Sequence, residues 1–327
     1  MKWQNNLPPL HFGKEGNKNL TPAPPHGRPR PFWRRVKYKL EMNPRFTILL
    51  PTTNDRGLLL PYSVGSVLKQ TIADFELLII GDGVNEYTRG VIHQLLEKDK
   101  RIKFFDFPKH IRRGEPNRHQ VLTNEAKGQF VAYLLDRDLW LPNHLENLLR
   151  LFEKGNFVSS NYFKPLQTGD IRYGYSHASQ HFVFSAVAHT YEFYKNLPFG
   201  WRTTPPDIFT DDYMWAQFMA HPSYQPYFSG EATLLYFKRG ATYPGIPTHE
   251  RVDELTSWEA KLTDNEFLKA ATREALQALL DERAALQNDW IRIKGKTWAE
   301  LIPFLRVKLT YALYSLKRRL DYAKKGQ

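Results

Sequence analysis

Two carboxylates stand two residues apart in Asp136-Arg137-Asp138, directly after an apolar segment. That segment, residues 130–135 (FVAYLL), predicts a buried strand. Carboxylate oxygens at a strand end can converge on Mg²⁺ or Mn²⁺, which keeps positions open for phosphate oxygens. A cation held there would neutralise charge on a departing diphosphate. The alternative interpretation is a solvated acidic turn before a helix that begins near Pro142.

Two more polar clusters follow apolar segments. Asp82 lies in IIGDG, where the flanking glycines let the backbone approach a ligand closely. Its carboxylate can accept a hydrogen bond from a base or a ribose. Residues 51–54 (PTTN) follow FTILL and offer hydroxyl and amide groups to a nucleoside. Each cluster taken singly also fits an ordinary turn.

The elements that must position these residues alternate along the chain from Arg45. Apolar runs predict strands, and amphipathic spacing predicts helices between them; the strands are 46–50, 75–80, 102–107 and 130–135, and the helices are 58–70, 87–99 and 118–127. This order predicts an α/β protein with a mostly parallel central sheet flanked by helices. Ligands bind beyond the carboxyl ends of such strands, where all three polar clusters fall.

Composition and motifs exclude several classes. The chain has 327 residues, of which 42% are hydrophobic, 24% are charged and none is cysteine. A disulfide scaffold, a zinc–thiolate site and a cysteine nucleophile are therefore excluded. Neither G-x-G-x-x-G nor G-x-x-x-x-G-K-[ST] occurs, which argues against a Rossmann dinucleotide site and a P-loop. No apolar run approaches the roughly 20 residues that span a bilayer, and the first residues lack a signal-peptide core, so we expect a cytoplasmic protein.

Two stretches together resemble family 2 glycosyltransferases of the GT-A fold. Residues 46–84 read FTILLPTTNDRGLLLPYSVGSVLKQTIADFELLIIGDGV, with an apolar strand into a P-T-x-N turn, then S-V-L-x-Q-T and F-E-L. Residues 126–149 read AKGQFVAYLLDRDLWLPNHLENLL, with an acidic cluster before L-W-L-P. The resemblance implies a GT-A fold and a nucleotide-sugar-dependent transferase, usually inverting. It fades after residue 150.

The resemblance also implies a donor site. The residues that would line its nucleoside pocket are Pro51, Thr52, Asn54 and Asp82. Arg118 would lie near the diphosphate, and Asp136 and Asp138 would hold the ribose and a Mg²⁺ or Mn²⁺ ion. Arg137 departs from the pattern, because the family usually has an Asp there that often contacts the metal. Either the two Asp residues suffice, or metal binding is weakened, or the guanidinium itself binds phosphate.

Inverting transfer needs a general base for the acceptor hydroxyl. The family places an Asp near the start of a later helix, and the match here is Asp211, with Asp212 one residue away. The alternative is an acidic helix N-terminus that serves only stability. Gly200-Trp201 and the following Thr-Thr-Pro loop are candidates for a wall that stacks on the acceptor, although a Trp of this kind more often lies half in the core. His189 and His249 are candidates for extra ligands, although a lone histidine is usually structural.

The net charge of +12 lies at the two ends. Residues 1–44 hold nine Lys/Arg against two Asp/Glu and are rich in proline, which predicts a flexible basic extension. Residues 45–250 are expected to form the GT-A domain and residues 251–327 a helical C-terminal region. Residues 301–327 form an amphipathic pattern with basic residues, which suits either packing on the body or peripheral contact with the inner face of a membrane.

We therefore expect an enzyme that moves a sugar from a nucleotide-diphosphate donor to a hydroxyl of a glycan, a lipid-linked saccharide or a protein. A catalytically weak nucleotide-sugar- or carbohydrate-binding relative is the alternative that Arg137 raises. A nucleic-acid binder would place its positive charge on the folded body, whereas the body here is near neutral, so no nucleic-acid partner is expected. A nucleotidyltransferase is disfavoured because the first strand is not followed by a glycine-rich basic loop.

Overall fold

The computed structural model describes residues 43–166, 171–176, 182–237, 247–262, 264–291 and 298–325. The predicted basic extension, residues 1–44, lies almost entirely outside the described residues.

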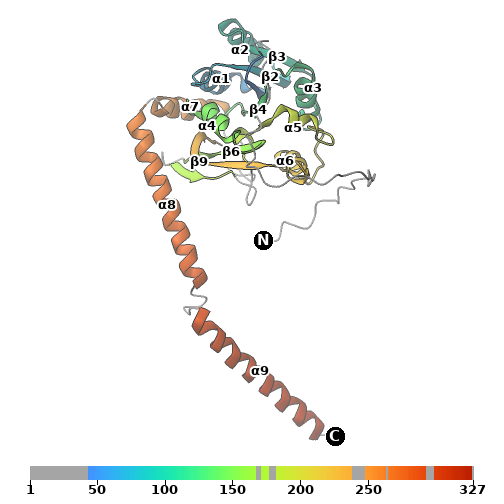
Figure 1. Ribbon diagram of the computed structural model, residues 1–327, viewed down its shortest axis with the longest axis vertical. Helices are drawn as coiled ribbons and strands as arrows, with labels where there is room; N and C mark the ends of the chain where they lie inside the picture. Colours follow the sequence, from blue (N-terminus) through green and yellow to red (C-terminus); the bar gives the residue numbers. More distant parts are fainter. Residues whose placement is uncertain are drawn as a thin grey trace, which may run out of the picture. The chain divides into compact units, whose positions relative to one another are not determined.

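The first half of the chain forms the parallel part of one sheet (Figure 1). Its strands are β1 (Phe46–Asn54), β2 (Phe75–Val84), β3 (Ile102–Phe107) and β4 (Phe130–Tyr133), in the order β3-β2-β1-β4. The connecting helices are α1 (Leu60–Leu68), α2 (Glu86–Lys98) and α3 (Glu115–Glu125). The predicted βαβ alternation is confirmed, and every carboxyl end of these strands points to one edge.

The second half extends the same sheet with mixed pairing. Its elements are β5 (Leu139–Trp140), α4 (His144–Leu151), β6 (Phe157–Pro165), β7 (Ile171–Gly174), β8 (Val187–Thr190), α5 (Tyr191–Lys195), α6 (Thr210–Ala220) and β9 (Pro226–Leu235). The strand β8 runs antiparallel to β4 and β6, while β6 and β9 are parallel. Short 3-10 turns lie at Arg56–Leu58 and Phe184–Ala186. The predicted α/β class is confirmed.

Alternation along the buried strands builds a separate core on each face of the sheet. In β1, Ile48 and Leu50 join the core beneath α1, α2 and α4, whereas Leu49 joins the core beneath α3, α5 and α6. The second core is mainly aromatic and includes Trp201 and Trp215. The strands are hydrophobic on both faces because helices cover both faces.

The strand β1 runs further than its apolar run predicts. The expected turn at residues 51–54 continues the ladder, since Thr52 pairs with Gly81 and Asn54 with Val84. The strand ends where Asn54 takes a positive φ of 46°, a conformation that asparagine tolerates better than most residues. The polar residues 51–54 therefore belong to the sheet ladder and not to a loop.

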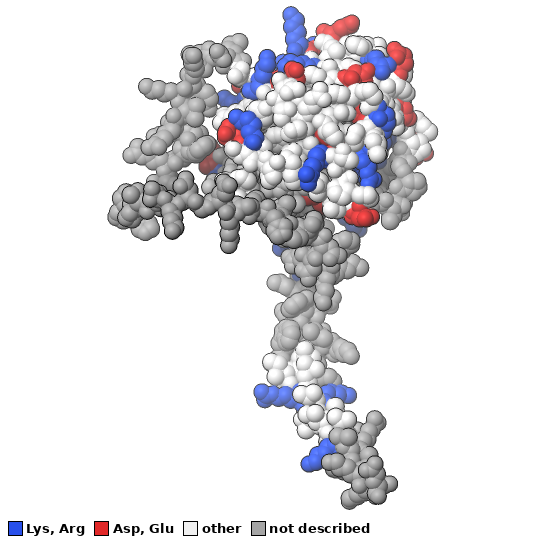
Figure 2. Space-filling view, turned by 90° about the vertical axis from the view of Figure 1, so that its right-hand side faces the viewer, with Lys and Arg blue, Asp and Glu red and all other residues white. Residues whose placement is uncertain are grey.

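Within the residues that the structure describes, three helices follow the sheet. They are α7 (Thr248–Leu262), α8 (Asn265–Ile291) and α9 (Trp298–Lys325), as the helical pattern predicts. Leu255 and Trp258 of α7 are buried in a third core with Leu139 and Phe237. Lys and Arg side chains project from the described part of α9 (Figure 2). Among the residues that the structure describes, no helix is both long enough and apolar enough to cross a bilayer.

His189 of β8 is fully buried and hydrogen-bonded at both ring nitrogens. Its Nδ1 lies 3.0 Å from the carbonyl oxygen of Thr190, so it donates, and its Nε2 accepts from the Tyr133 hydroxyl at 2.6 Å. Burial lowers the pKa of His189 to about 3, and burial likewise lowers the pKa of His144 to about 3. Both histidines are therefore neutral parts of the core.

These two histidines make stability sensitive to acid. Their folded-state pKa lies below the unfolded value near 6.5, so the stabilisation is complete above pH 6.5 and is lost as the pH falls toward 3. At pH 5 we expect each to lower the free energy of unfolding by about 2 kcal/mol relative to pH 7. Urea denaturation at both pH values measures this, and His189→Gln should reduce the difference. Equal stability of the wild type at pH 7 and pH 5 would contradict the assignment.

Candidate active site

Hydrogen bonds from β1 join the ends of three parallel strands. The Thr52 hydroxyl donates to Oδ2 of Asp136, after β4, at 3.0 Å. The Thr53 hydroxyl donates to the carbonyl oxygen of Asp82, in β2, at 2.6 Å. Asp82 and Asp136 are both buried at 5% exposure. Pro51 lies half-buried within the same strand end, and Asn54 is exposed at its tip. The structure thus brings the expected nucleoside residues together.

The loop after β3 covers Asp82, a contact that the sequence analysis did not predict. Oδ2 of Asp82 accepts from the Lys109 ammonium group at 2.5 Å, and Oδ1 accepts from the backbone N–H of His110 at 2.6 Å. Lys109 also donates to the Thr53 hydroxyl at 3.3 Å. Gly114 has a φ of 68°, and a Cβ atom there would lie 3.0 Å from the Asp82 carboxyl carbon. Glycine at position 114 therefore permits the close approach of the loop.

Arg118 of α3 is a buried cation at the centre of the site. Its guanidinium lies over the ring of Trp201 at 4.9 Å and donates to the carbonyl oxygen of Arg113 at 2.9 Å. Within the described residues, its Nε is buried without a hydrogen-bond partner. A buried N–H of this kind is costly unless it finds an acceptor, and a phosphate oxygen would satisfy it.

Three carboxylates act on this guanidinium. Burial lowers the pKa of Arg118, while Asp211, Glu115 and Asp82 oppose that effect in this order. Asp82 ends β2, whereas Asp211 belongs to α6, so the strand-end cluster and the predicted base share one cation. The side chains of Asp211, Arg137 and Asp138 also act on the half-buried hydroxyl of Tyr236. The sequence-predicted residues therefore converge on one region.

Glu115 ties together the segments around Arg118, and the sequence analysis did not select it. Its side chain is fully buried; Oε2 accepts from the N–H of Arg113 at 3.0 Å, and Oε1 accepts from the N–H of Thr204 at 3.3 Å and the Thr210 hydroxyl at 3.4 Å. Thr210 begins α6 and immediately precedes Asp211. Burial raises the pKa of Glu115, but hydrogen bonds from backbone N–H groups and the Arg118 charge outweigh it, so the pKa lies below its ordinary value.

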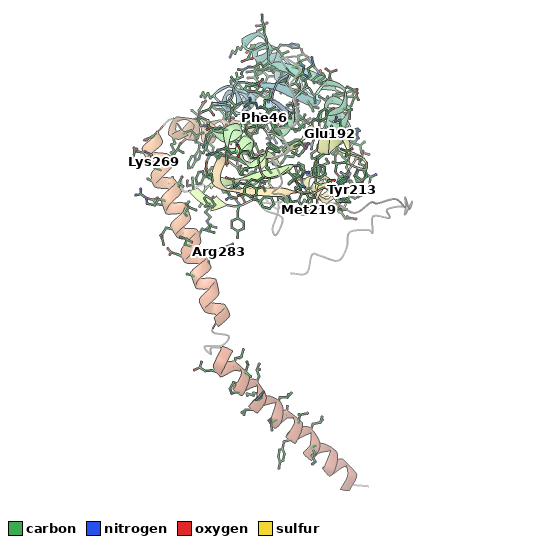
Figure 3. All side chains as sticks on the ribbon, viewed as in Figure 1. Phe46, Glu192, Tyr213, Met219, Lys269 and Arg283 are labelled. Carbon is green, nitrogen blue, oxygen red and sulfur yellow. The ribbon has the colours of Figure 1, made fainter. Side chains whose placement is uncertain are left out.

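The predicted base lies in the first turn of α6. Asp211 and Asp212 are both half-buried there, and Figure 3 shows Tyr213 and Met219 further along the same helix. Phe209 is the N-cap residue and provides no side-chain cap. Negative charge is favoured in this turn by the helix dipole. Stability and catalysis therefore favour the same residue type, so position alone does not choose between the two interpretations.

The carboxylates after β4 point in different directions. Asp138 is fully buried; its Oδ2 accepts from the Ser185 hydroxyl at 2.6 Å and its Oδ1 accepts from the N–H of Phe237 at 3.1 Å. Burial raises the pKa of Asp138, against the charge of Arg137 and these two hydrogen bonds. Both oxygens are thus engaged by protein donors. A metal site that uses Asp136 and Asp138 together does not fit this arrangement, and no cluster of three His, Asp or Glu suited to a metal occurs in the described part of the chain.

Packing removes two further candidates from the site. Trp201 is 2% exposed and its ring packs edge-on against Trp215, so the prediction that it forms an acceptor wall is wrong. His189 is not free to bind a metal, because both ring nitrogens are hydrogen-bonded inside the core. His249 is exposed near the start of α7. The local sequence around Trp201 does not indicate whether its ring faces the core or an open site.

The loop contacts had a partial signal in the sequence. Lys109, His110, Arg112 and Arg113 form a basic run directly after the third strand, at the carboxyl edge where ligands bind. That position identifies the loop as part of the site. Nothing in the local pattern indicates that Lys109 reaches Asp82, because the contact joins residues 27 positions apart.

Comparisons with known proteins agree with this architecture. The chain matches the model of "Glycosyl transferase family 2" over residues 47–218, which is more than half of its length. It is 30% identical over 112 residues to a GalNAc(5)-diNAcBac-PP-undecaprenol beta-1,3-glucosyltransferase of Campylobacter jejuni, covering 34% of this chain and 36% of that protein. It is 31% identical over 118 residues to the UDP-Glc:alpha-D-GlcNAc-diphosphoundecaprenol beta-1,3-glucosyltransferase WfgD of Escherichia coli, covering 36% and 45%.

A solved structure shares the fold. The S. aureus TarS fragment 1-349 in complex with UDP-GlcNAc superposes with a TM-score of 0.50 at 13% identity, covering 61% of this chain and 62% of that one. The fold is therefore of the GT-A type. The chain belongs to glycosyl transferase family 2. The matches span less than half the length of these two curated relatives.

Substitution of Glu115 tests the link between α6 and the loop that follows β3. Gln has one acceptor oxygen, so Glu115→Gln leaves one N–H weakly paired and should lower the free energy of unfolding by about 1–3 kcal/mol. Displacement of Asp211 should lower kcat for sugar transfer by about 10–100-fold with a smaller change in the donor KM. Urea denaturation and steady-state kinetics measure the two effects. Glu125→Gln, at the other end of α3, is the matched control, and equal kcat in both variants would contradict the role of Glu115.

Proposed function

We propose that the protein is a glycosyltransferase that moves a sugar from a nucleotide-diphosphate donor to a hydroxyl acceptor. The observation that carries the proposal is the buried guanidinium of Arg118, whose Nε has no hydrogen-bond partner within the described residues. Arg118 belongs to α3, and the first residue of that helix, Glu115, accepts a hydrogen bond from Thr210, which immediately precedes Asp211. A donor bound along the carboxyl edge of the sheet would place its diphosphate beside Arg118 and its sugar toward Asp211. Membership of glycosyl transferase family 2 supports the same chemistry.

The donor would be held through its nucleoside and its phosphates. The residues proposed for the nucleoside are Pro51, Thr52, Asn54 and Asp82, with Asp136 on the ribose. The buried Nε of Arg118 would donate to a phosphate oxygen. Lys109 already donates to one carboxylate oxygen of Asp82. It would therefore have to shift, or to share Asp82 with the nucleobase of the donor. Binding therefore exchanges an internal ion pair for contacts with the donor.

We propose inversion by one-step displacement, with Asp211 as the general base and Asp212 as the alternative. The base removes the proton of the acceptor hydroxyl as its oxygen attacks the anomeric carbon and the diphosphate leaves. Burial lowers the pKa of Arg118 and the charge of Asp211 opposes that effect, and this interaction between the carboxylate and the cation for the leaving group supports the role.

For the leaving group we propose charge stabilisation by Arg137 and Arg118. Asp138 is turned into the core, which removes one of the two carboxylates expected to bind Mg²⁺ or Mn²⁺. Arg137 is half-buried and acts on Tyr236 together with Asp211. A guanidinium carries a permanent charge and can bind phosphate in a bidentate manner. The alternative is a cation held by Asp136 and the donor phosphates.

The acceptor class is proposed from the named relatives. The C. jejuni and E. coli proteins are named for acceptors in which a saccharide is linked through diphosphate to undecaprenol. We propose a lipid-linked saccharide for this chain too, which would place the reaction at the inner face of a membrane, with residues 301–327 making a peripheral contact.

A catalytically weak nucleotide-sugar-binding relative is the second candidate. The observation that favours it is the combination of Arg137 with an inward-facing Asp138. Such a protein would bind the donor without turning it over, so donor binding and donor turnover must be measured separately.

Asp211→Asn tests the reaction. A panel of nucleotide-diphosphate sugars should raise the melting temperature of the wild type and of the variant, because the donor site is intact in both. Release of nucleotide diphosphate should fall by about 10²–10⁴-fold in the variant, because the general base is lost. Asp212→Asn is the matched control in the same turn and should retain most activity.

The outcomes separate the proposals. No melting shift with any donor would overturn the function itself. A shift without turnover in the wild type would favour the binding relative. Full turnover in Asp211→Asn, together with loss of turnover in Asp212→Asn, would assign the general base to Asp212 in place of Asp211.

Chelation tests the leaving-group proposal. We expect donor turnover in excess EDTA to match turnover with Mg²⁺ or Mn²⁺, and Arg137→Gln to lower kcat/KM by about 10²-fold because a charge at the diphosphate is lost. Arg150→Gln, which breaks a surface ion pair with Glu231, is the control for a general loss of charge. Abolished turnover in EDTA that Mn²⁺ restores would overturn the proposal in favour of a metal held by Asp136.

A further inference from the structure

The helix α9 presents a row of exposed aliphatic side chains. Its members are more than half exposed, at 52–63%, and are Ile302, Leu305, Leu309, Leu313 and Leu316. At 3.6 residues per turn they fall within an arc of roughly 80° on one side of the helix. Scattered exposed leucines are ordinary, but an aligned row of five is a patch that usually has a partner.

Cations border this row on both sides. Angles here are rotations about the helix axis. On the side of the row that ends at Leu313, Arg306 and Lys317 lie roughly 20–40° beyond that residue. On the side that ends at Leu305, Lys308 lies roughly 60° beyond it. Figure 2 shows blue side chains on two sides of a white surface along this helix. Residues 301–327 hold seven Lys/Arg against one Asp. Long basic side chains at the borders of an apolar stripe can keep their charges in the headgroup layer while the stripe is buried.

We propose that α9 docks the protein on an anionic lipid surface, with the row of Ile302, Leu305, Leu309, Leu313 and Leu316 inserted among the acyl chains. The charge favours this occupant over a second copy of the chain, because two α9 helices packed row to row would bring their cations together. An anionic bilayer supplies both an apolar interior and compensating charge. The inference deepens, and rests on, the peripheral contact of residues 301–327 in the proposed function, but it does not depend on Asp211.

Two pairs of variants separate insertion from simple charge attraction. Leu309→Glu with Leu313→Glu places two negative charges in the row. Val307→Glu with Tyr314→Glu changes the net charge equally on the opposite side of the helix, at residues that are 55% and 66% exposed. Flotation of the full chain with vesicles of phosphatidylcholine, or of phosphatidylcholine with phosphatidylglycerol, measures binding.

The wild type should float with the phosphatidylglycerol vesicles and only weakly with phosphatidylcholine alone. The Leu309/Leu313 pair should weaken binding at least about tenfold, and the Val307/Tyr314 pair much less, because only the first disrupts the inserted face. Donor turnover without vesicles should stay within about twofold in both, since neither pair changes a residue of the proposed donor site, so failure here is distinguishable from failure of the transferase function.

Three results would overturn the proposal. The first is absence of wild-type flotation with anionic vesicles. The second is equal weakening by both variant pairs, which would reduce the contact to unspecific charge attraction. The third is light scattering that shows a dimer which the Leu309/Leu313 pair dissociates while neither protein binds vesicles, which would assign the row to a second copy.

Discussion

The site depends on keeping the Arg118 guanidinium charged inside the protein. Removal of a guanidinium from water is expensive, and breaking a buried ion pair costs about 3–5 kcal/mol. Here the charges of Asp211, Glu115 and Asp82, which come from three different elements, oppose that cost, although burial still lowers the pKa of Arg118. Glu115 also accepts hydrogen bonds from Arg113, Thr204 and Thr210, which joins the loop before α3 to the start of α6. The same cation then retains an unused Nε for a ligand.

The aromatic core beneath α3, α5 and α6 makes this arrangement possible. Trp201 and Phe184 form an apolar bed for the Arg118 guanidinium, at 4.9 and 5.5 Å from the ring centroids. An aromatic face attracts a cation and excludes water at the same time. Burial of Trp201 therefore serves the site through Arg118, although the ring is not available to an acceptor. The aromatic residues of this core therefore do two things: they pack against one another, and they hold the charged guanidinium of Arg118.

The residues after β4 show how a family pattern can be altered without loss of the fold. Asp138 has been drawn into the structure, where it joins the turn at Ser185 to the strand end at Phe237. Arg137 supplies positive charge at the place where the pattern has an acidic residue. The Asp138 carboxylate thus serves as a structural acceptor, and Arg137 places a positive charge between the two carboxylates.

The sequence by itself determined the order of strands and helices from residue 46 to residue 135, since hydrophobic periodicity is a local property that each segment carries alone. It also determined that the polar clusters at residues 51–54, 82 and 136–138 lie at one edge, because parallel strands bring their carboxyl ends together. The tertiary structure decided which way each side chain turns. Asp136 faces the Thr52 hydroxyl and Asp138 faces the core, and Lys109 and Glu115 join the site through partners far away in the chain. Those choices depend on packing between distant segments, which no local pattern contains.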